Sequence, residues 1–256
     1  MTEDYILGNL DIASIALWLF FFFFVALVVW IQRENQREGY PLVDEDGSQA
    51  DAGSVFPNPA DKTFRLPHGQ GEVTVPSGQN PERADIAMAP SAASGGFPFE
   101  PTGNPMADGV GPASWANRKD LPELDGKGHP KIVPMSAIEG FAVSAGRDPR
   151  GLPVVAGDGA IAGKVVDMWI DEPEQLVRYL EVELEADIGT GTRLIPMTLA
   201  RIWGEKVLVK SIYGEHFGGV PKHAAPRQVT KLEEDKISGY YGGGHLYAGK
   251  RQDSLI

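Results

Sequence analysis

Acidic side chains gather in the second half of this 256-residue chain, and they are its clearest candidates for chemistry. Six carboxylates and one arginine lie between residues 167 and 183: Asp167, Asp171, Glu172, Glu174, Glu181, Glu183 and Arg178. Neighbouring carboxylates raise one another's pKa, so that some titrate near neutrality, whereas a nearby arginine restrains that shift. Two interpretations stay open: a solvated face of a sheet, or a chain of carboxylates that exchanges protons.

A second and looser group consists of Asp125 and His129. Histidine titrates near neutral pH, so this group could take protons from bulk water. The sequence has no P-loop, no G-x-S-x-G and no H-E-x-x-H motif, and it has no cysteine. The lack of cysteine excludes disulfides, thiolate zinc sites and a thiol nucleophile. We therefore expect no catalytic residue and no metal site on this chain.

Short β-strands must position these acids. Strands are predicted by apolar runs, alternation with a period of two and turn residues, at 161–170, 179–184, 194–197, 202–203 and 207–209. Their close spacing predicts a small antiparallel barrel that is closed or nearly closed. Thr230 and Glu233 form a capping-box pattern, which predicts a short C-terminal helix from Lys231 to Tyr241 that stops at Gly242–Gly244.

An apolar segment near the N-terminus is long enough to lie in a membrane. The 20 residues from Ile12 to Ile31 contain one polar side chain, Ser14, and five consecutive phenylalanines, Phe20–Phe24. At about 1.5 Å per residue such a helix spans roughly 30 Å, the thickness of a bilayer core. The acidic residues before the segment disfavour a signal peptide, so we predict a single transmembrane anchor.

The charges around this anchor predict its orientation. Arg33 and Arg37 follow it and no Lys or Arg precedes it, so residues 1–11 are expected in the periplasm and the rest in the cytoplasm. Trp30, Arg33, Arg37 and Tyr40 are the expected residues at the membrane interface. The net charge of −12 argues against a nucleic-acid partner and against attraction to anionic lipid, which favours a protein partner for the cytoplasmic part.

Residues 32–130 are rich in Gly and Pro but keep apolar islands such as Phe64 and Trp115. This pattern is read either as a disordered linker or, preferably, as an extended segment that lies on partner subunits. Residues 63–66 and 73–75 could pair as a small hairpin. The predicted divisions are thus 1–11, 12–31, 32–130 and 131–256.

Longer strings of the sequence resemble the H subunit of the purple bacterial photosynthetic reaction centre along nearly the whole chain. The similar strings are Arg37–Leu42, Lys62–Gly69, Pro101–Pro105, Gly109–Trp115, Asp148–Val154, Ala162–Asp167, Glu233–Lys236 and Leu246–Ala248. The resemblance implies a PRC-type β-barrel after the single anchor, in a bacterial inner (intracytoplasmic) membrane.

The resemblance also implies a function. Such a subunit binds no cofactor of its own and caps the L and M subunits, which hold bacteriochlorophyll, bacteriopheophytin, quinones and non-haem iron. It shields the quinone sites and supports proton transfer to the secondary quinone during light-driven electron transport. The core light-harvesting antenna and membrane lipids are further expected partners.

Individual residues carry over from the resemblance. Glu174 matches a carboxylate near the quinone proton path, with Asp171 in the same segment, and Arg178 and Asp167 are expected to tune or support it. Asp125 and His129 match a surface group where protons enter. Lys127 stands where some relatives have a second histidine, and an ammonium that stays protonated at pH 7 is a poor proton shuttle.

One alternative function belongs to a different class. A membrane-tethered PRC-barrel adaptor would bind soluble partners, such as RNA-processing proteins, through a basic or apolar barrel face and a flexible tether. The acidic balance and the matched apolar islands favour the reaction-centre subunit.

Overall fold

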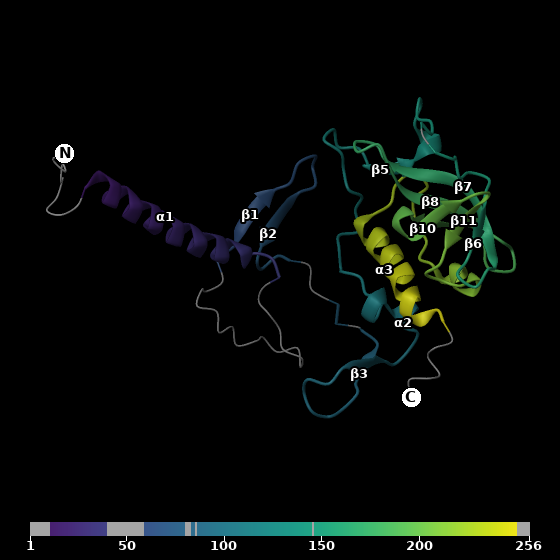
Figure 1. Ribbon diagram of the computed structural model, residues 1–256, viewed down its shortest axis with the longest axis horizontal. Coiled ribbons are helices and arrows are strands. Elements are labelled where there is room, and N and C mark those ends of the chain that lie inside the picture. The colour runs from purple at the N-terminus through teal and green to yellow at the C-terminus, as the bar shows by residue number, and fades with distance from the viewer. Residues whose placement is uncertain (1–10, 40–58, 80–82, 85, 145, 250–256) are drawn as a thin grey trace. The chain divides into compact units, whose positions relative to one another are not determined.

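The computed structural model describes residues 11–39, 59–79, 83–84, 86–144 and 146–249 (Figure 1). The chain forms two compact units, Met1–Gln79 and Asn80–Ile256. The second unit begins well before the predicted boundary at 130/131, because residues between 80 and 130 pack against the C-terminal helix.

The first unit contains one long apolar helix, α1, Ile12–Asn35. It begins at the predicted residue and ends four residues beyond Ile31, where the predicted segment stops. The Asp11 carboxylate accepts a hydrogen bond from the Ser14 backbone N–H at 2.7 Å, which satisfies one free donor of the first turn. The helix has no buried residue, and it is the one helix among the described residues that is long and apolar enough to cross a membrane.

The residues that follow the apolar segment are tied to the rest of this unit. Arg37 Nε lies 2.7 Å from Glu34 Oε2, and Arg37 Nη1 donates to the Ala60 carbonyl at 2.6 Å. Trp30 and Arg33 are exposed, and Tyr40 lies outside the described residues, so their place at a membrane interface stays a prediction.

Strands β1, Lys62–Arg65, and β2, Glu72–Val75, form the predicted hairpin. They are antiparallel, with Thr63 opposite Thr74 and a 2.8 Å hydrogen bond between the two hydroxyls. The sequence prediction of pairing in this region is therefore confirmed.

The second unit opens with small elements before its main sheet. Strands β3, Met88–Pro90, and β4, Phe99–Pro101, form a second antiparallel hairpin. The short helix α2, Pro105–Asp108, and the 3-10 turn η1, Gly111–Ala113, then pack against the C-terminal helix. Part of the segment predicted to lie on partner subunits thus packs against its own chain.

The main sheet has seven strands: β5 Ile132–Pro134, β6 Pro153–Val155, β7 Ile161–Asp171, β8 Leu176–Leu184, β9 Thr192–Pro196, β10 Ala200–Trp203 and β11 Lys206–Val209. Their order is β10-β11-β6-β7-β8-β9, and β5 also pairs with β7. All pairs are antiparallel except β6 with β11, a parallel pair that differs from the predicted fully antiparallel arrangement. This pair joins the last hairpin, β10–β11, to β6 and through β6 to the long strand β7.

The C-terminal helix, α3, covers one side of these strands (Figure 1). It spans Lys231–Tyr247 and starts with the predicted capping box, in which Thr230 Oγ1 accepts from the Glu233 N–H and the Glu233 carboxylate accepts from the Thr230 N–H. Its buried residues Ile237, Tyr240 and Tyr241 belong to the same core as the strands.

The prediction that this helix ends at Gly242–Gly244 is wrong. A Cβ on Gly243 would collide with Ala113, and a Cβ on Gly244 would collide with the Ser211 carbonyl. These glycines let the helix backbone approach its neighbours closely, and the resulting burial offsets their low helix propensity. The helix therefore continues through them and is capped at Ala248.

Candidate functional site

Strand pairing brings a lysine that the sequence analysis overlooked next to the predicted acids. Strand β5 pairs with β7 so that Ile132 lies opposite Asp171. Lys131, directly before β5, therefore lies beside the turn that joins β7 to β8, where Glu174 is found. The Glu172 N–H donates to the Lys131 carbonyl at 3.1 Å, which fastens this turn to the segment before β5.

The Lys131 ammonium contacts three carboxylates, and we call these four residues the Lys131 cluster. Lys131 Nζ lies 2.9 Å from Glu174 Oε1, 3.1 Å from Asp171 Oδ2 and 3.7 Å from Glu123 Oε1. The Asp171 side chain is buried, with 1% exposed, whereas that of Glu174 is 52% exposed. The cluster therefore extends from a buried carboxylate to the surface.

Lysine determines the electrostatics of this cluster. The hydrogen bond from Lys131, followed by its Coulombic attraction, holds the pKa of Glu174 below its ordinary value. Hydrogen bonds to Glu174 and then to Asp171 raise the pKa of Lys131, so the ammonium stays charged. For Glu174 this direction is opposite to the raised pKa expected from clustered carboxylates, because the Lys131 ammonium lies among them.

Asp125 and His129 form a tight exposed turn. The Asp125 carboxylate accepts from the backbone N–H groups of Lys127 and His129, each at 2.8 Å, and its Oδ2 lies 3.7 Å from His129 Nδ1. The His129 N–H makes the largest contribution to lowering the pKa of Asp125. The carboxylate thus stays ionised beside an imidazole that is 73% exposed.

A short hairpin joins this turn to the Lys131 cluster. Leu124 pairs with Pro130, the Asp125 N–H donates to the His129 carbonyl, and the Lys131 N–H donates to the Glu123 carbonyl, the last two at 2.8 Å. The turn forms one end of the hairpin, and Glu123 and Lys131 form the other. The hairpin therefore carries Asp125 and His129 at its turn, and Lys131 at its other end contacts Asp171 at the end of β7 and Glu174 in the turn that follows.

The other predicted residues form no ion pair with Lys131 in the described part of the chain. Asp167 is buried and accepts from the backbone N–H groups of Met168, at 2.8 Å, and Ser136, at 3.3 Å. Glu181 accepts from the Trp169 indole at 3.0 Å, and Arg178 is exposed. The charge of Arg178 also lowers the pKa of Glu174, after the two effects of Lys131.

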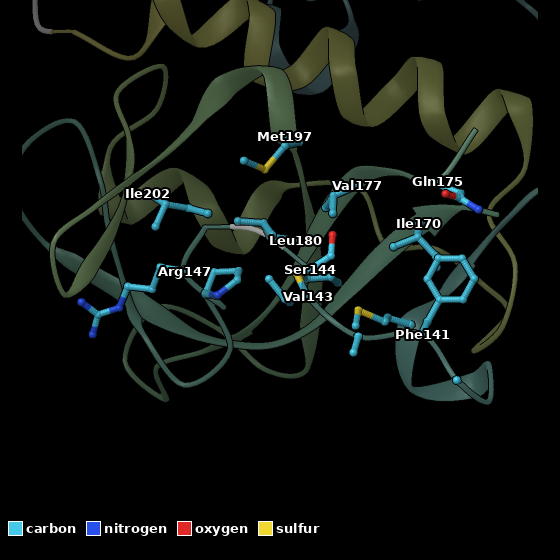
Figure 2. Close-up of a pocket in the computed structure, with 15 residues that line it drawn as sticks. Phe141, Val143, Ser144, Arg147, Ile170, Gln175, Val177, Leu180, Met197 and Ile202 are labelled. Carbon is cyan, nitrogen blue, oxygen red and sulfur yellow. The ribbon is translucent and has the colours of Figure 1, made fainter. Parts of the chain in front are cut away.

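The barrel has an apolar cavity of about 530 Å³ between the sheet and residues 140–149 (Figure 2). Met168 and Ile170 of β7 and Val177 and Leu180 of β8 line it. The lining contains no carboxylate and one charged side chain, Arg147, whose guanidinium lies at one edge in Figure 2. Since this cavity has no carboxylate in its lining, the Lys131 cluster is the candidate site for proton transfer.

Comparison with known families then places the chain. Residues 4–137 match the family of the photosynthetic reaction centre H-chain, N-terminal region, which covers more than half of the sequence. The chain belongs to the reaction-centre H-chain family. Residues 142–216 match the PRC-barrel domain, which agrees with the mainly β second unit and confirms the predicted fold class. Reaction-centre H chains are structural subunits, so this family favours a reaction-centre subunit over a free adaptor.

Proposed function

We propose that this H chain caps the cytoplasmic face of the L and M subunits, shields their quinone sites and supports proton transfer to the secondary quinone. The chain performs no catalysis of its own in this proposal. Bacteriochlorophyll, bacteriopheophytin, quinones and non-haem iron are held by the partner subunits. The core light-harvesting antenna and membrane lipids are its further partners in this proposal.

The observation that carries the proton-transfer proposal is the hairpin from Glu123 to Lys131. At one end His129 is exposed to water and held beside the ionised Asp125, which suits it to accept and release protons. At the other end Lys131 holds Glu174 and Asp171 together. Protons would enter at His129 and Asp125 and pass toward Glu174.

Glu174 is the most exposed carboxylate of the Lys131 cluster. It is half exposed in this chain, so a docked subunit can cover it. Covering removes water, and loss of water raises a carboxyl pKa, which opposes the lowering by Lys131. Docking would in this way bring Glu174 closer to the pH range in which it takes up and releases protons.

Lys127 belongs to the same turn but has a different part in the proposal. Its backbone N–H supports Asp125, and its side chain is exposed. Since an ammonium does not shuttle protons at neutral pH, proton entry relies on His129 and Asp125.

The proposed membrane arrangement rests on α1. Its exposed apolar surface suits a single span in a bacterial inner (intracytoplasmic) membrane. Arg33 in the last turn of α1 and Arg37 just after the helix support an orientation in which the main domain is cytoplasmic and the N-terminus is periplasmic.

A substitution at Glu174 tests the proposed proton path. Glu174→Gln in the assembled complex is expected to slow the proton-coupled second reduction of the secondary quinone by about tenfold or more, because the amide cannot carry the proton. Flash absorption spectroscopy measures this rate together with primary charge separation, which is expected to stay unchanged.

Glu172→Gln is the matched control, because Glu172 is exposed in the same turn and its carboxylate lies outside the Lys131 cluster. Its second-reduction rate is expected to equal that of the wild type. Equal second-reduction rates in Glu174→Gln and the wild type would show that Glu174 is not part of the proton path.

A further inference from the structure

A second carboxyl group lies in an unusual environment at the start of α3. The Tyr179 hydroxyl, on β8, donates a 2.7 Å hydrogen bond to Glu234 Oε2. Tyr179 is 5% exposed, and Glu234 is partly buried between β8 and the first turn of α3. No Lys, Arg or His in the described part of the chain forms an ion pair with Glu234, unlike Asp171 and Glu174.

Charged groups of both signs surround this carboxyl. Glu234 lines a cleft of about 300 Å³ together with five other charged residues: Arg118, Glu123, Arg178, Lys231 and Asp235. Arg118 Nε lies 3.0 Å from Asp235 Oδ1, so part of its charge is already balanced. Glu123 faces this cleft and also lies 3.7 Å from Lys131 Nζ, which makes it common to the cleft and the Lys131 cluster.

We propose that Glu234, with the Tyr179 hydroxyl as its hydrogen-bond donor, is a second proton-binding group of this chain and is coupled to the Lys131 cluster through Glu123. The inference rests on the proposed function, because it adds a reservoir to the same proton path. The carboxylate of Glu234 takes up one proton and becomes a neutral carboxylic acid. Tyr179 keeps its own proton throughout.

The electrostatics of the pair agree with this assignment. Burial raises the pKa of Glu234, and this effect exceeds the opposing effects of the Tyr179 hydrogen bond and the Arg178 charge. Burial also raises the pKa of Tyr179, which therefore remains a phenol and a donor. Glu123 and Asp235 raise the pKa of Glu234 further, as neighbouring negative charges do. The pKa of Glu234 is thus raised whereas that of Glu174 is lowered, so these two carboxyl groups of the chain are expected to titrate in different pH ranges.

Infrared titration of the full-length chain in detergent tests proton binding directly. Difference spectra between about pH 4 and pH 8 follow the carbonyl band of protonated carboxyl groups. The wild type is expected to keep a protonated carboxyl group to higher pH than its exposed glutamates. This signal is expected to disappear in Glu234→Gln and to titrate at a different pH in Tyr179→Phe.

Glu185→Gln is the matched control, since Glu185 is exposed just after β8. It is expected to keep the high-pH signal. An unchanged high-pH signal in Glu234→Gln would overturn the assignment. Tyr179→Phe keeps the Glu234 carboxyl group but removes its hydrogen-bond donor, so a shifted titration in this variant gives independent support for the same assignment.

Proton uptake by the assembled complex, followed with a pH-indicator dye after light flashes, tests the coupling. Glu234→Gln is expected to reduce uptake in the pH range where the high-pH signal titrates, and Glu185→Gln is expected to leave it unchanged. If Glu234→Gln loses the infrared signal but the complex still takes up protons as the wild type does, Glu234 is not coupled to the proton path. A wild-type second-reduction rate in Glu174→Gln would instead contradict the proposed function, so the two failures are distinguishable.

Discussion

Lys131 determines how the carboxylates at the candidate site are arranged and charged. In the described part of the chain it is the cation that forms ion pairs with Asp171, Glu174 and Glu123. Asp171 is buried, and its hydrogen-bonded ion pair with Lys131 offsets part of the cost of burying a carboxylate. Removing the ammonium therefore takes away the ion-pair partner of all three carboxylates.

Substitution of this lysine is expected to change the titration of Glu174. In Lys131→Met the pKa of Glu174 should rise toward or above its ordinary value, because the hydrogen bond and attraction that lower it are lost. Carbon-13 NMR of the labelled glutamate carboxyl groups measures this pKa in the full-length chain. Lys127→Met, which removes an exposed lysine of the same hairpin, should leave it unchanged. An unaltered Glu174 titration in Lys131→Met would show that Lys131 does not control it.

Glu234 predicts a pH dependence of stability with a definite sign. Its pKa is raised in the folded chain, so the folded state binds more protons than the unfolded state between the ordinary glutamate pKa, about 4.3, and the raised one. Its contribution to stability is complete below the ordinary value and is lost as the pH rises through the raised one. Chemical unfolding at several pH values should show this loss in the wild type, and a smaller loss in Glu234→Gln. The same pH dependence in both proteins would contradict the raised pKa.

The sequence predicted the residue types of the site better than their contacts. Asp125, His129, Asp171 and Glu174 were identified from their chemistry or from the family resemblance. Lys131 was missed because its role depends on the pairing of β5 with β7, which joins residues about forty positions apart. Asp167 was grouped with the other acids by its position in the sequence, but the fold directs its carboxylate to the backbone of Ser136 and Met168.

At the level of elements, α3 depends on glycines that pack closely. Gly239, Gly243 and Gly244 are buried on the side of the helix that faces Ala113 and Ser211. A helix with larger residues at these positions could not approach η1 and the barrel so closely. The same helix presents Glu234 to Tyr179, so its packing also positions the proposed proton-binding pair.

A glycine substitution tests this packing. Gly244→Ala is expected to destabilise the chain by about 1–3 kcal/mol, because the new methyl group collides with the Ser211 carbonyl and Ile212. Gly242→Ala is the matched control, since its new methyl group would meet a single atom, the Pro112 carbonyl oxygen, at 3.1 Å. Urea unfolding of the full-length chain in detergent should rank Gly244→Ala as clearly the less stable. Equal stability of the two variants would contradict the close-packing explanation.

Elements with local signals were predicted well. The apolar helix, the β1–β2 hairpin, the main strands and the capping box at Thr230 each follow from short patterns in the sequence. The end of α3 was not, because three consecutive glycines resemble a helix stop until their tertiary neighbours are known. The parallel pairing of β6 with β11 likewise depends on how the whole sheet curls.

The whole molecule combines an apolar helix with an acidic domain, and its average properties conceal both. The mean hydropathy of −0.18 averages a membrane-spanning candidate with a polar remainder. Membership of the reaction-centre H-chain family explains why both parts occur in one chain, since such a chain meets membrane and protein partners. Neither the family nor its partners follow from composition alone.

Purification from native membranes tests the central claim, that this chain is a subunit of a pigmented reaction centre. An affinity tag on the chain, mild detergent and an absorption spectrum of the eluate suffice. We expect bacteriochlorophyll and bacteriopheophytin bands to elute with the chain in constant ratio to the L and M subunits. A chain that elutes without pigment under these conditions would contradict the account.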